Sequence, residues 1–377
     1  MKKYLKIFII LTLQNLLIFN SIITFLYNNK KCDNNKYFES EVRKTYKSLN
    51  RVNINEIDEK INAKLFEFNK NIKSTINIGF TLDLNYVLET MLTVASIMAT
   101  QKSTTKIRFH FGVTKGFTTE KMLQIYGLRS KLNNLTEFNF YYLKDSVEKM
   151  KNFHPKGEAC PGKFELPILL PDDIEKLIIF DAGDLLVLRD LSDMYNYEMG
   201  KYWVLGTPEP TIIDSFLKVE YNMTKYVNIG SILLNIKELK QNNFWVTYSQ
   251  NRYIKIEGQP DQTLFNILVP DDKKNYLPFK FGGFSIIKSD QNYDSLNFDN
   301  FRFKTWLNNS LSSSLPEKPT SEKEILINLY NPRFIHQFSG KWENGEGLTI
   351  YRLLSKYFIN LAGIKEEICK KKPGYCI

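Results

Sequence analysis

The chain has 377 residues, of which 43% are hydrophobic and 14% aromatic, so it can bury a large core and is not a disordered polypeptide. The formal net charge of +10 comes from lysines scattered among Asn and Ile, and no Lys/Arg block has interleaved aromatic residues, which argues against a nucleic-acid partner. The sequence contains neither G-x-G-x-x-G nor G-x-x-x-x-G-K-[ST], which disfavours dinucleotide-cofactor enzymes and P-loop NTPases.

An apolar segment at residues 4–27 predicts a membrane helix. It carries Lys6 as its only charge and exceeds the roughly 20 residues that a membrane span needs. A cleaved signal peptide is the alternative, but no small-x-small site precedes Tyr27. We therefore expect residues 1–27 to be the uncleaved signal anchor of a single-pass type II protein in the Golgi or endoplasmic reticulum membrane. The rest of the chain would then be luminal, where it could be glycosylated at the N-x-S/T sequons of Asn134, Asn222 and Asn308.

Residues 28–73 are rich in Lys, Asn and Glu and predict a stem. Apolar side chains recur at steps of three and four from Ile54 to Ile72, a spacing that makes one apolar stripe on a helix. The stripe covers only about three heptads. Both a short coiled coil and a helix docked on the following domain therefore remain open.

Four cysteines occur, and no two of them have the C-x-x-C spacing of zinc or thioredoxin-like sites. They are Cys32, Cys160, Cys369 and Cys376. In an oxidising lumen we expect a disulfide between Cys369 and Cys376, although four cysteines allow three pairings.

From residue 74 the pattern alternates between strands and helices, which predicts an α/β domain. Strands are expected at 74–83, 107–113, 138–143 and 177–180, and residues 87–100 are helical by period. This order predicts a mostly parallel sheet covered by helices on both faces, and such sheets bind ligands outside the carboxyl ends of their strands. Asp83 and Asp181 both lie at such ends. We expect this domain to span 74–345 and a C-terminal helix and tail to span 346–377.

The most informative motif is Asp181-Ala182-Gly183-Asp184, which stands between two apolar segments. Two carboxylates at the end of a buried strand supply hard oxygen ligands, so a divalent cation could sit there with positions open for a diphosphate. A polar turn between two core strands, with Gly183 supplying the bend, is the alternative interpretation.

Three later motifs place polar residues at the ends of predicted elements. They are Asn228 and Gly230 at the entry of a strand over 226–236, Asp261 and Gln262 at a helix start, and His336 at a strand end followed by Gly340 and Lys341. Each has a structural alternative: a turn for Asn-x-Gly, an N-cap for Asp261, and a hydrogen-bonded core residue for His336.

Taken in order, the motifs from about Ile76 to Gly345 closely resemble glycosyltransferase family 8, the retaining nucleotide-sugar transferases that include glycogenin and bacterial lipopolysaccharide galactosyltransferases. The resemblance implies a single GT-A-like domain. It implies transfer of a sugar with retention from a nucleotide sugar, a UDP-hexose or UDP-pentose, to a glycan or glycoprotein acceptor. It also implies Mn²⁺ or a similar divalent cation, held by Asp181, Asp184 and His336.

The matching motifs also imply a donor site. Its residues would be Thr81, Asp83, Asn85 and Tyr86 of TLDLNY, together with Lys163, Glu209, Asn228, Gly230, Gly340 and Lys341. Within this set Lys163 is the basic residue before the helix that leads into the metal motif, and Glu209 would face the sugar and acceptor. Gln262 and Asp261 are the implied catalytic residues, which would orient the sugar and stabilise a cationic anomeric carbon. In retaining members the departing phosphate can itself take the acceptor's proton.

The sequence departs from the family pattern at two motifs. The family's metal motif is Asp-x-Asp, whereas an ungapped match aligns Asp184 with the second Asp and places Ala182 at the first. Asp181 is one position early, so either a one-residue bulge lets its carboxylate reach the metal or the metal site is weakened. The closing Lys-Pro-Trp is reduced to Lys341-Trp342. A catalytically degenerate relative that binds nucleotide sugar or glycan as a partner subunit is therefore the alternative hypothesis.

Overall fold

The structure is a computed structural model, and the part of the chain that it describes begins, apart from one two-residue strand, at residue 74. The described residues are 51–52, 74–102, 104–129, 136–143, 160–183, 185–208, 218–251, 260–278, 281, 283–286, 334–337 and 349–371. The predicted membrane helix at 1–27 and nearly all of the predicted stem lie outside them. No helix among the described residues is long and apolar enough to cross a membrane.

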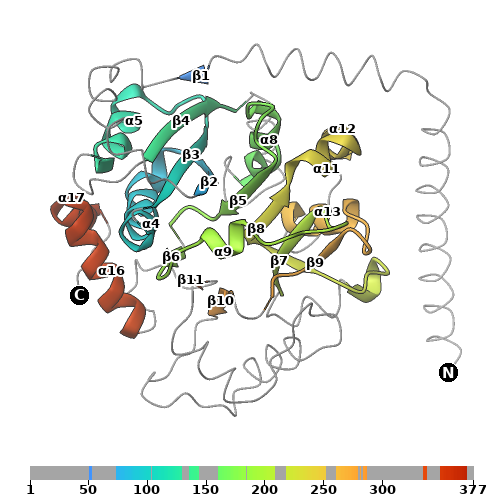
Figure 1. The fold of residues 1–377 in the computed structure, drawn as a ribbon. Coiled ribbons are helices and arrows are strands. Elements are labelled where there is room, and N and C mark those ends of the chain that lie inside the picture. Colours follow the sequence, from blue (N-terminus) through green and yellow to red (C-terminus); the bar gives the residue numbers. More distant parts are fainter. Residues whose placement is uncertain are drawn as a thin grey trace, which may run out of the picture. The chain divides into compact units, whose positions relative to one another are not determined.

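An eight-stranded sheet forms the centre of the fold, in the order β1-β4-β3-β2-β5-β8-β7-β9 (Figure 1). Its strands are β1 Arg51–Val52, β2 Ser74–Leu82, β3 Thr105–Val113, β4 Thr136–Tyr142, β5 Lys176–Phe180, β7 Val204–Pro208, β8 Val227–Asn235 and β9 Lys274–Tyr276. β1 and β8 run against the other six strands. The predicted mostly parallel sheet is therefore confirmed, with an antiparallel strand, β8, set into its middle.

A second, smaller sheet was not predicted. It has the order β10-β11-β6, with β10 Gly283–Ile286, β11 Phe334–Gln337 and β6 Leu185–Val187. β6 follows the Asp181–Asp184 motif and pairs antiparallel with β11, so that Leu185 lies opposite His336. Two motifs far apart in the sequence are therefore neighbours through backbone pairing.

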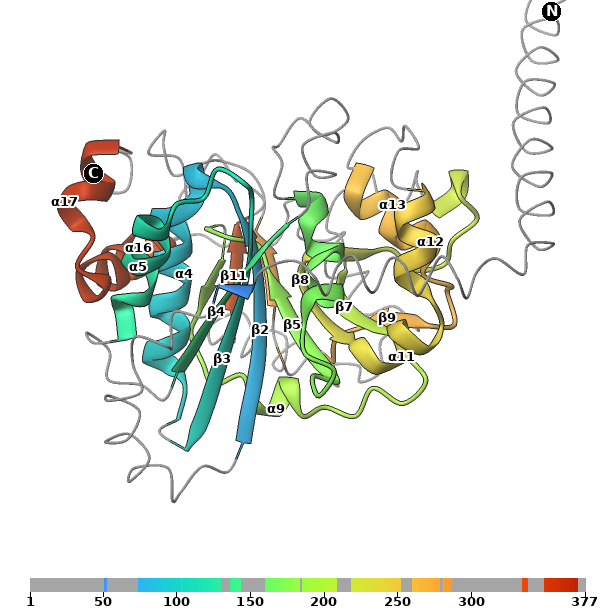
Figure 2. The ribbon, with the colours of Figure 1, turned by 90° about the horizontal axis from the view of Figure 1, so that it is seen from above.

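Helices cover both faces of the large sheet (Figure 2). On one side lie α4 Val87–Thr100 and α5 Thr119–Tyr126, with α16 Thr349–Ala362 packed on α4 and α17 Lys365–Lys371 following it. On the other lie η4 Cys160–Phe164, α8 Leu166–Leu169, α11 Ile236–Gln241, α12 Phe244–Asn251 and α13 Pro260–Leu268. The short helices η3 Leu84–Tyr86 and α9 Ser192–Tyr195 complete the described elements.

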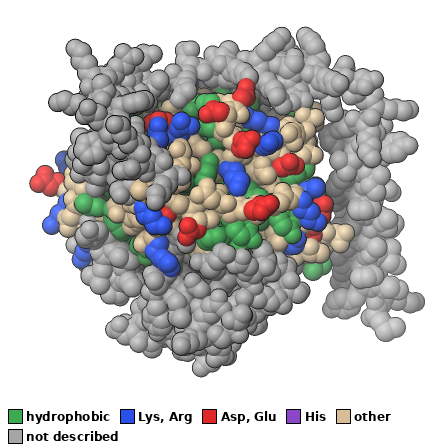
Figure 3. All heavy atoms as spheres, in the orientation of Figure 1, with side chains coloured by type: hydrophobic (Ala, Val, Ile, Leu, Met, Phe, Trp, Pro, Cys, Tyr) green, Lys and Arg blue, Asp and Glu red, His purple; other side chains and the backbone are tan. Residues whose placement is uncertain are grey.

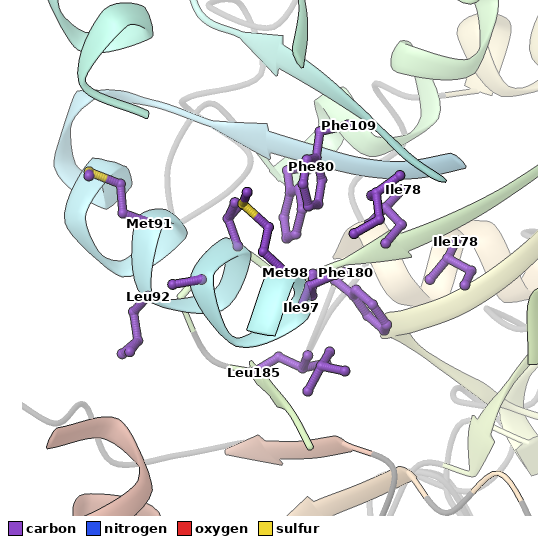
Figure 4. Close-up of a cluster of buried hydrophobic side chains, with 14 of the residues drawn as sticks. Ile78, Phe80, Met91, Leu92, Ile97, Met98, Phe109, Ile178, Phe180 and Leu185 are labelled. Carbon is purple, nitrogen blue, oxygen red and sulfur yellow. The ribbon is translucent and has the colours of Figure 1, made fainter. Parts of the chain in front are cut away.

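Successive side chains of each strand point to opposite faces of the large sheet, so the core has two layers. In β5, Ile178 and Phe180 join the cluster that contains α4, whereas Leu177 and Ile179 join the cluster on the other face. Figure 4 shows Phe180 beside Ile97 of α4. Side chains of a strand alternate between the faces of the sheet, and this explains why the four buried positions of β5, Leu177–Phe180, are all apolar. Its carboxyl end is consequently held from both sides.

Described Lys and Arg side chains are interspersed with Asp and Glu on the face seen in Figure 3. This arrangement is that of a solvated surface and not of a stripe that would follow a phosphate backbone. At the C-terminal end, Cys369 is disulfide-bonded. The side chains of the other three cysteines lie outside the described residues, so its pairing with Cys376 stays a prediction.

The segment that joins β5 to β6 requires a glycine at position 183. Gly183 has a φ of +88°, in the left-handed region that side chains disfavour. A Cβ placed there would lie 2.3 Å from the Cβ of Glu89 in α4. The segment therefore combines an unusual backbone conformation with close packing against a helix.

We predict that Gly183→Ala destabilises the fold far more than Gly200→Ala. Gly200 also has a positive φ, +54°, but an added Cβ meets nothing within 4 Å. Strain alone should cost about 1 kcal/mol at Gly200, whereas strain plus overlap should cost about 3 kcal/mol at Gly183. Urea unfolding of both variants measures the difference. Equal losses would show that contact with Glu89 does not restrict this segment.

Candidate active site

The ends of three strands meet at one edge of the large sheet. β2 and β5 are parallel and end there, while β8 is antiparallel to β5 and begins there, with Phe180 opposite Ser231. The backbone N–H of Asp181 donates to the carbonyl oxygen of Gly230 at 2.8 Å. The metal-motif carboxylate and the Asn-x-Gly motif, predicted separately, are thus adjacent.

Asp181 has a cationic partner. Lys163 lies in η4, is 5% exposed, and its Nζ forms an ion pair with Oδ1 of Asp181. The Asp181 side chain is 28% exposed, so the carboxylate stands between a buried cation and the open edge of the sheet. The structure therefore brings together a residue predicted to contact the donor and a residue predicted to bind the metal.

The Asn-x-Gly motif occupies an irregularity in β8. Gly206 of β7 lies opposite Ile232, but the next residue, Thr207, lies opposite Asn228. Three residues of β8, from Ile229 to Ser231, therefore have no register partner on β7, a bulge of the kind that often adjoins active sites. Asn228 is buried, and its Oδ1 accepts a hydrogen bond from the N–H of Gly230 at 2.9 Å. This side-chain bond to the backbone two residues ahead is that of an Asx turn, but the motif itself lies within β8 and not in a turn between elements.

Two amide side chains of α13 hold this irregular backbone. Oε1 of Gln262 accepts from the N–H of Ile229 at 3.1 Å. One turn further along, Asn266 accepts from the N–H of Val227 and donates to its carbonyl, both at 2.8 Å. Residues four apart lie on one helix face, so α13 presents both amides to β8. Asn266 was missed at the sequence level, although its spacing from Gln262 could have indicated it.

Asp261, the other residue of the pair, lies within the first turn of α13, which begins at Pro260. It is therefore inside the helix and not at the preceding N-cap position, and its side chain is partly exposed. The predicted helix start is confirmed. Asp261 and the buried Gln262 are consecutive, so they project from the helix in different directions.

A polar cluster around the buried Lys274 contacts α13 at Asn266. Lys274 is 1% exposed and donates to the carbonyl of Asn266, and it pairs with Asp271 at 3.0 Å. Burial lowers the pKa of Lys274, partly offset by Asp271. Burial alone would raise the pKa of Asp271, but hydrogen bonds from Thr224 and Lys274 outweigh it and hold that pKa below its usual value. None of these residues was singled out in the sequence.

The predicted nucleotide loop lies at the end of β2. Thr81 is buried within the strand, and its Oγ1 has no hydrogen-bond partner among the described residues. Asp83 accepts a hydrogen bond from the N–H of Asn85 at 2.8 Å and so begins η3. Asn85 is exposed and Tyr86 half-buried. A buried hydroxyl without a partner beside exposed polar residues fits a site that takes a polar ligand.

Of the predicted metal ligands, the described residues include Asp181 and the backbone of His336. Asp184 lies outside the described residues, as do Glu209, Gly340 and Lys341, and only the backbone of His336 is described. The described side chains contain no cluster of three metal-binding residues. The backbone nevertheless places His336 opposite Leu185, the residue that follows Asp184 and lies four positions after Asp181, which itself follows the last residue of β5. Two carboxylates and an imidazole at neighbouring positions are a suitable donor set for Mn²⁺.

We predict that Lys163→Met lowers the free energy of unfolding by about 3 kcal/mol, because it leaves the Asp181 carboxylate at a partly buried position without its cation. The control is Lys237→Met, which breaks the exposed pair of Lys237 with Glu175 at 3.3 Å. That variant should lose less than about 0.5 kcal/mol. Adding Asp181→Asn to Lys163→Met should recover part of the loss in urea unfolding. A double variant no more stable than Lys163→Met would exclude the ion pair as the cause.

Comparison with known proteins identifies the family. The profile of Glycosyl transferase family 8 matches residues 77–300, more than half of the chain. No curated protein matches the sequence at a significant level.

Solved structures share the fold. The bifunctional glycosyltransferase WbbM, in its apo form, has a TM-score of 0.59 and 17% identity over 80% of this chain, which spans about half, 52%, of WbbM. The galactosyltransferase LgtC, solved with donor and acceptor sugar analogs, has a TM-score of 0.52 and 17% identity over 76% of this chain and 95% of its own. GlyE of Streptococcus pneumoniae has a TM-score of 0.50 and 15% identity over 80% of this chain and 64% of its own. The family match carries the assignment that the motifs indicated: the chain belongs to glycosyl transferase family 8.

Proposed function

We propose that the chain transfers a sugar with retention from a UDP-sugar, a hexose or a pentose, to a glycan or glycoprotein acceptor, and that it requires a divalent cation. The observation that carries this proposal is the junction at the sheet edge, where Asp181, Gly230 and Gln262 meet through β5, β8 and α13. The predicted metal, donor and sugar positions are brought together there from segments far apart in the sequence. A surface turn would not need that convergence.

In this proposal each part of the edge has a separate task. Thr81 and the loop after it bind the nucleotide, and a divalent cation held by Asp181, Asp184 and His336 would supply positive charge beside the departing diphosphate. Gln262 and Asn228 fix the backbone against which the sugar lies, while Asp261 stabilises the positive anomeric carbon. The acceptor hydroxyl attacks from the face that the phosphate leaves, and the phosphate takes its proton. The protein then needs no strong base.

The ion pair of Lys163 with Asp181 favours a second candidate function. A carboxylate already neutralised by a buried lysine offers less charge to a cation, so the chain could bind a nucleotide sugar or glycan without turnover, as a partner subunit. Turnover and binding are separate measurements, and together they distinguish the two candidates.

We predict that purified protein hydrolyses or transfers from a UDP-sugar only with Mn²⁺ or a similar ion. Asp184→Ala should lose about 2 to 4 kcal/mol of transition-state stabilisation. Asp193→Ala removes an exposed carboxylate of α9 and serves as the control, which should keep wild-type activity. The measurement is kcat/KM over a panel of UDP- and GDP-sugars, with and without EDTA. Full activity in EDTA would contradict the metal requirement.

Calorimetry of UDP and Mn²⁺ binding separates the two candidates. The enzyme hypothesis expects Asp181→Asn to weaken Mn²⁺ binding about tenfold or more, since a direct carboxylate ligand is charge-assisted. Wild-type binding of UDP together with no turnover on any donor would favour the binding partner.

We further propose that the chain is a type II membrane protein with its transferase domain in the lumen of the Golgi or endoplasmic reticulum. The apolar segment 4–27, the sequons and the disulfide-bonded Cys369 support this topology. Asn222 is exposed in a turn with a φ of +52°, so a glycan could be attached there without unfolding the domain.

We predict that protein made in microsomes stays in the pellet on carbonate extraction and loses mass on glycosidase treatment. Asn222→Gln should remove one step of that mass shift, and Asn243→Gln, which alters an exposed asparagine outside any sequon, should not. An extractable product without glycans would favour a cytosolic enzyme.

A further inference from the structure

One edge of β6 is completed by side chains of α4. In a strand, residues two apart direct their backbone groups to the same edge, and β6 pairs with β11 along its other edge. On the free edge, Oγ1 of Thr93 donates to the carbonyl of Leu185 at 2.8 Å. Oγ of Ser96 accepts from the N–H of Val187 at 3.0 Å. Two hydroxyls thus stand where a neighbouring strand would be.

The direction of these bonds is fixed, because the Thr93 hydroxyl lies within reach of two carbonyl oxygens, that of Leu185 at 2.8 Å and that of Glu89 at 3.3 Å, and can only donate to them. Ser96 uses its own proton to donate to the carbonyl of Thr93 at 2.7 Å, which leaves its oxygen to accept from Val187. Thr93 and Ser96 are both fully buried, so water does not substitute for either hydroxyl. A buried backbone group that loses such a partner costs about 1 to 3 kcal/mol.

A third residue extends the same face of the helix. Glu89, Thr93 and Ser96 are four and three positions apart, so they lie on the same face of α4. The Cβ of Glu89 is the group that leaves no room for a side chain at Gly183. We call Glu89, Thr93 and Ser96 the α4 row. The row contacts residues 183, 185 and 187, three alternate positions of the segment that carries Asp184.

We propose that the α4 row is the positioning device of the metal site: it fixes the backbone on both sides of Asp184, and through β6 the place of His336 on β11. The inference rests on the proposed metal-dependent function. Residues that orient metal ligands without touching the ion typically change metal affinity 10- to 100-fold when they are replaced. Thr93 and Ser96 are therefore positioning residues and not catalytic ones.

The test compares substitutions of nearly equal volume in the full chain. Thr93→Val keeps the shape but removes the donor to Leu185, whereas Thr93→Ser keeps the hydroxyl and loses a methyl group. The matched control is Thr100→Val, which removes a hydroxyl whose partners among the described residues all lie within or next to α4, the nearest being the carbonyl of Ser96 at 2.8 Å. The readouts are Mn²⁺ affinity by calorimetry, amide hydrogen exchange at residues 185–187, and Tm.

We expect Thr93→Val to bind Mn²⁺ about tenfold more weakly and to exchange faster at residues 185–187. Thr93→Ser should stay near wild-type affinity although it loses more packing, and Thr100→Val should match wild type. Thr93→Val with wild-type affinity and exchange would overturn the inference, as would equal losses of affinity in the Ser and Val variants. If Thr93→Val does not fold, Ser96→Ala, which removes the acceptor for Val187, is held to the same criteria.

The design separates this inference from the proposed function. A wild-type chain that binds no Mn²⁺ would overturn the metal requirement itself. Hydrogen exchange at residues 185–187 would then decide alone whether the α4 row holds this segment. Unchanged exchange in both Thr93→Val and Ser96→Ala would exclude that role.

Discussion

The hydrogen bond from the N–H of Asp181 to the carbonyl of Gly230 joins the end of β5 to the bulge of β8, and the site is built around this junction. Because β8 runs antiparallel to β5, the start of β8 and the end of β5 lie at the same edge of the sheet. The bulge would leave backbone groups of β8 without partners, and Gln262 supplies one of those partners from α13. Because β8 has this bulge, the helix packed on it, α13, carries the amide side chains that bond its backbone.

Local pattern was sufficient to predict the regular elements. The helix expected at 87–100 is α4 with the same bounds, and the strands of the parallel half agree within a few residues, because buried runs and helical period are local signals. The pairing of β6 with β11 joins positions about 150 residues apart, and no local pattern specifies it. The predicted site residues came from the resemblance to a family, whereas their supports, Asn266 and Thr93, look in the sequence like ordinary helix residues.

The ion pair of Lys163 with Asp181 affects the electrostatics of the whole edge. The two charges, +1 and −1, cancel, so the pair adds no net repulsion against an anionic donor and little net attraction for a cation. Under the proposed function, much of the attraction for a divalent ion would then come from ligands further along the chain. The one-residue displacement of Asp181 relative to the family motif is consistent with this division of charge.

The way in which α4 completes β6 also bears on association between chains. A strand at the edge of a small sheet exposes N–H and C=O groups that can template pairing with a foreign strand, and proteins commonly protect such edges with bulges, charges or covering elements. Thr93 and Ser96 satisfy the groups of Leu185 and Val187 from a buried helix, so no second polypeptide can add to that edge without displacing α4. A loss of these hydroxyls would leave the carbonyl of Leu185 and the N–H of Val187 buried without partners, while α4 would still cover the edge against a foreign strand.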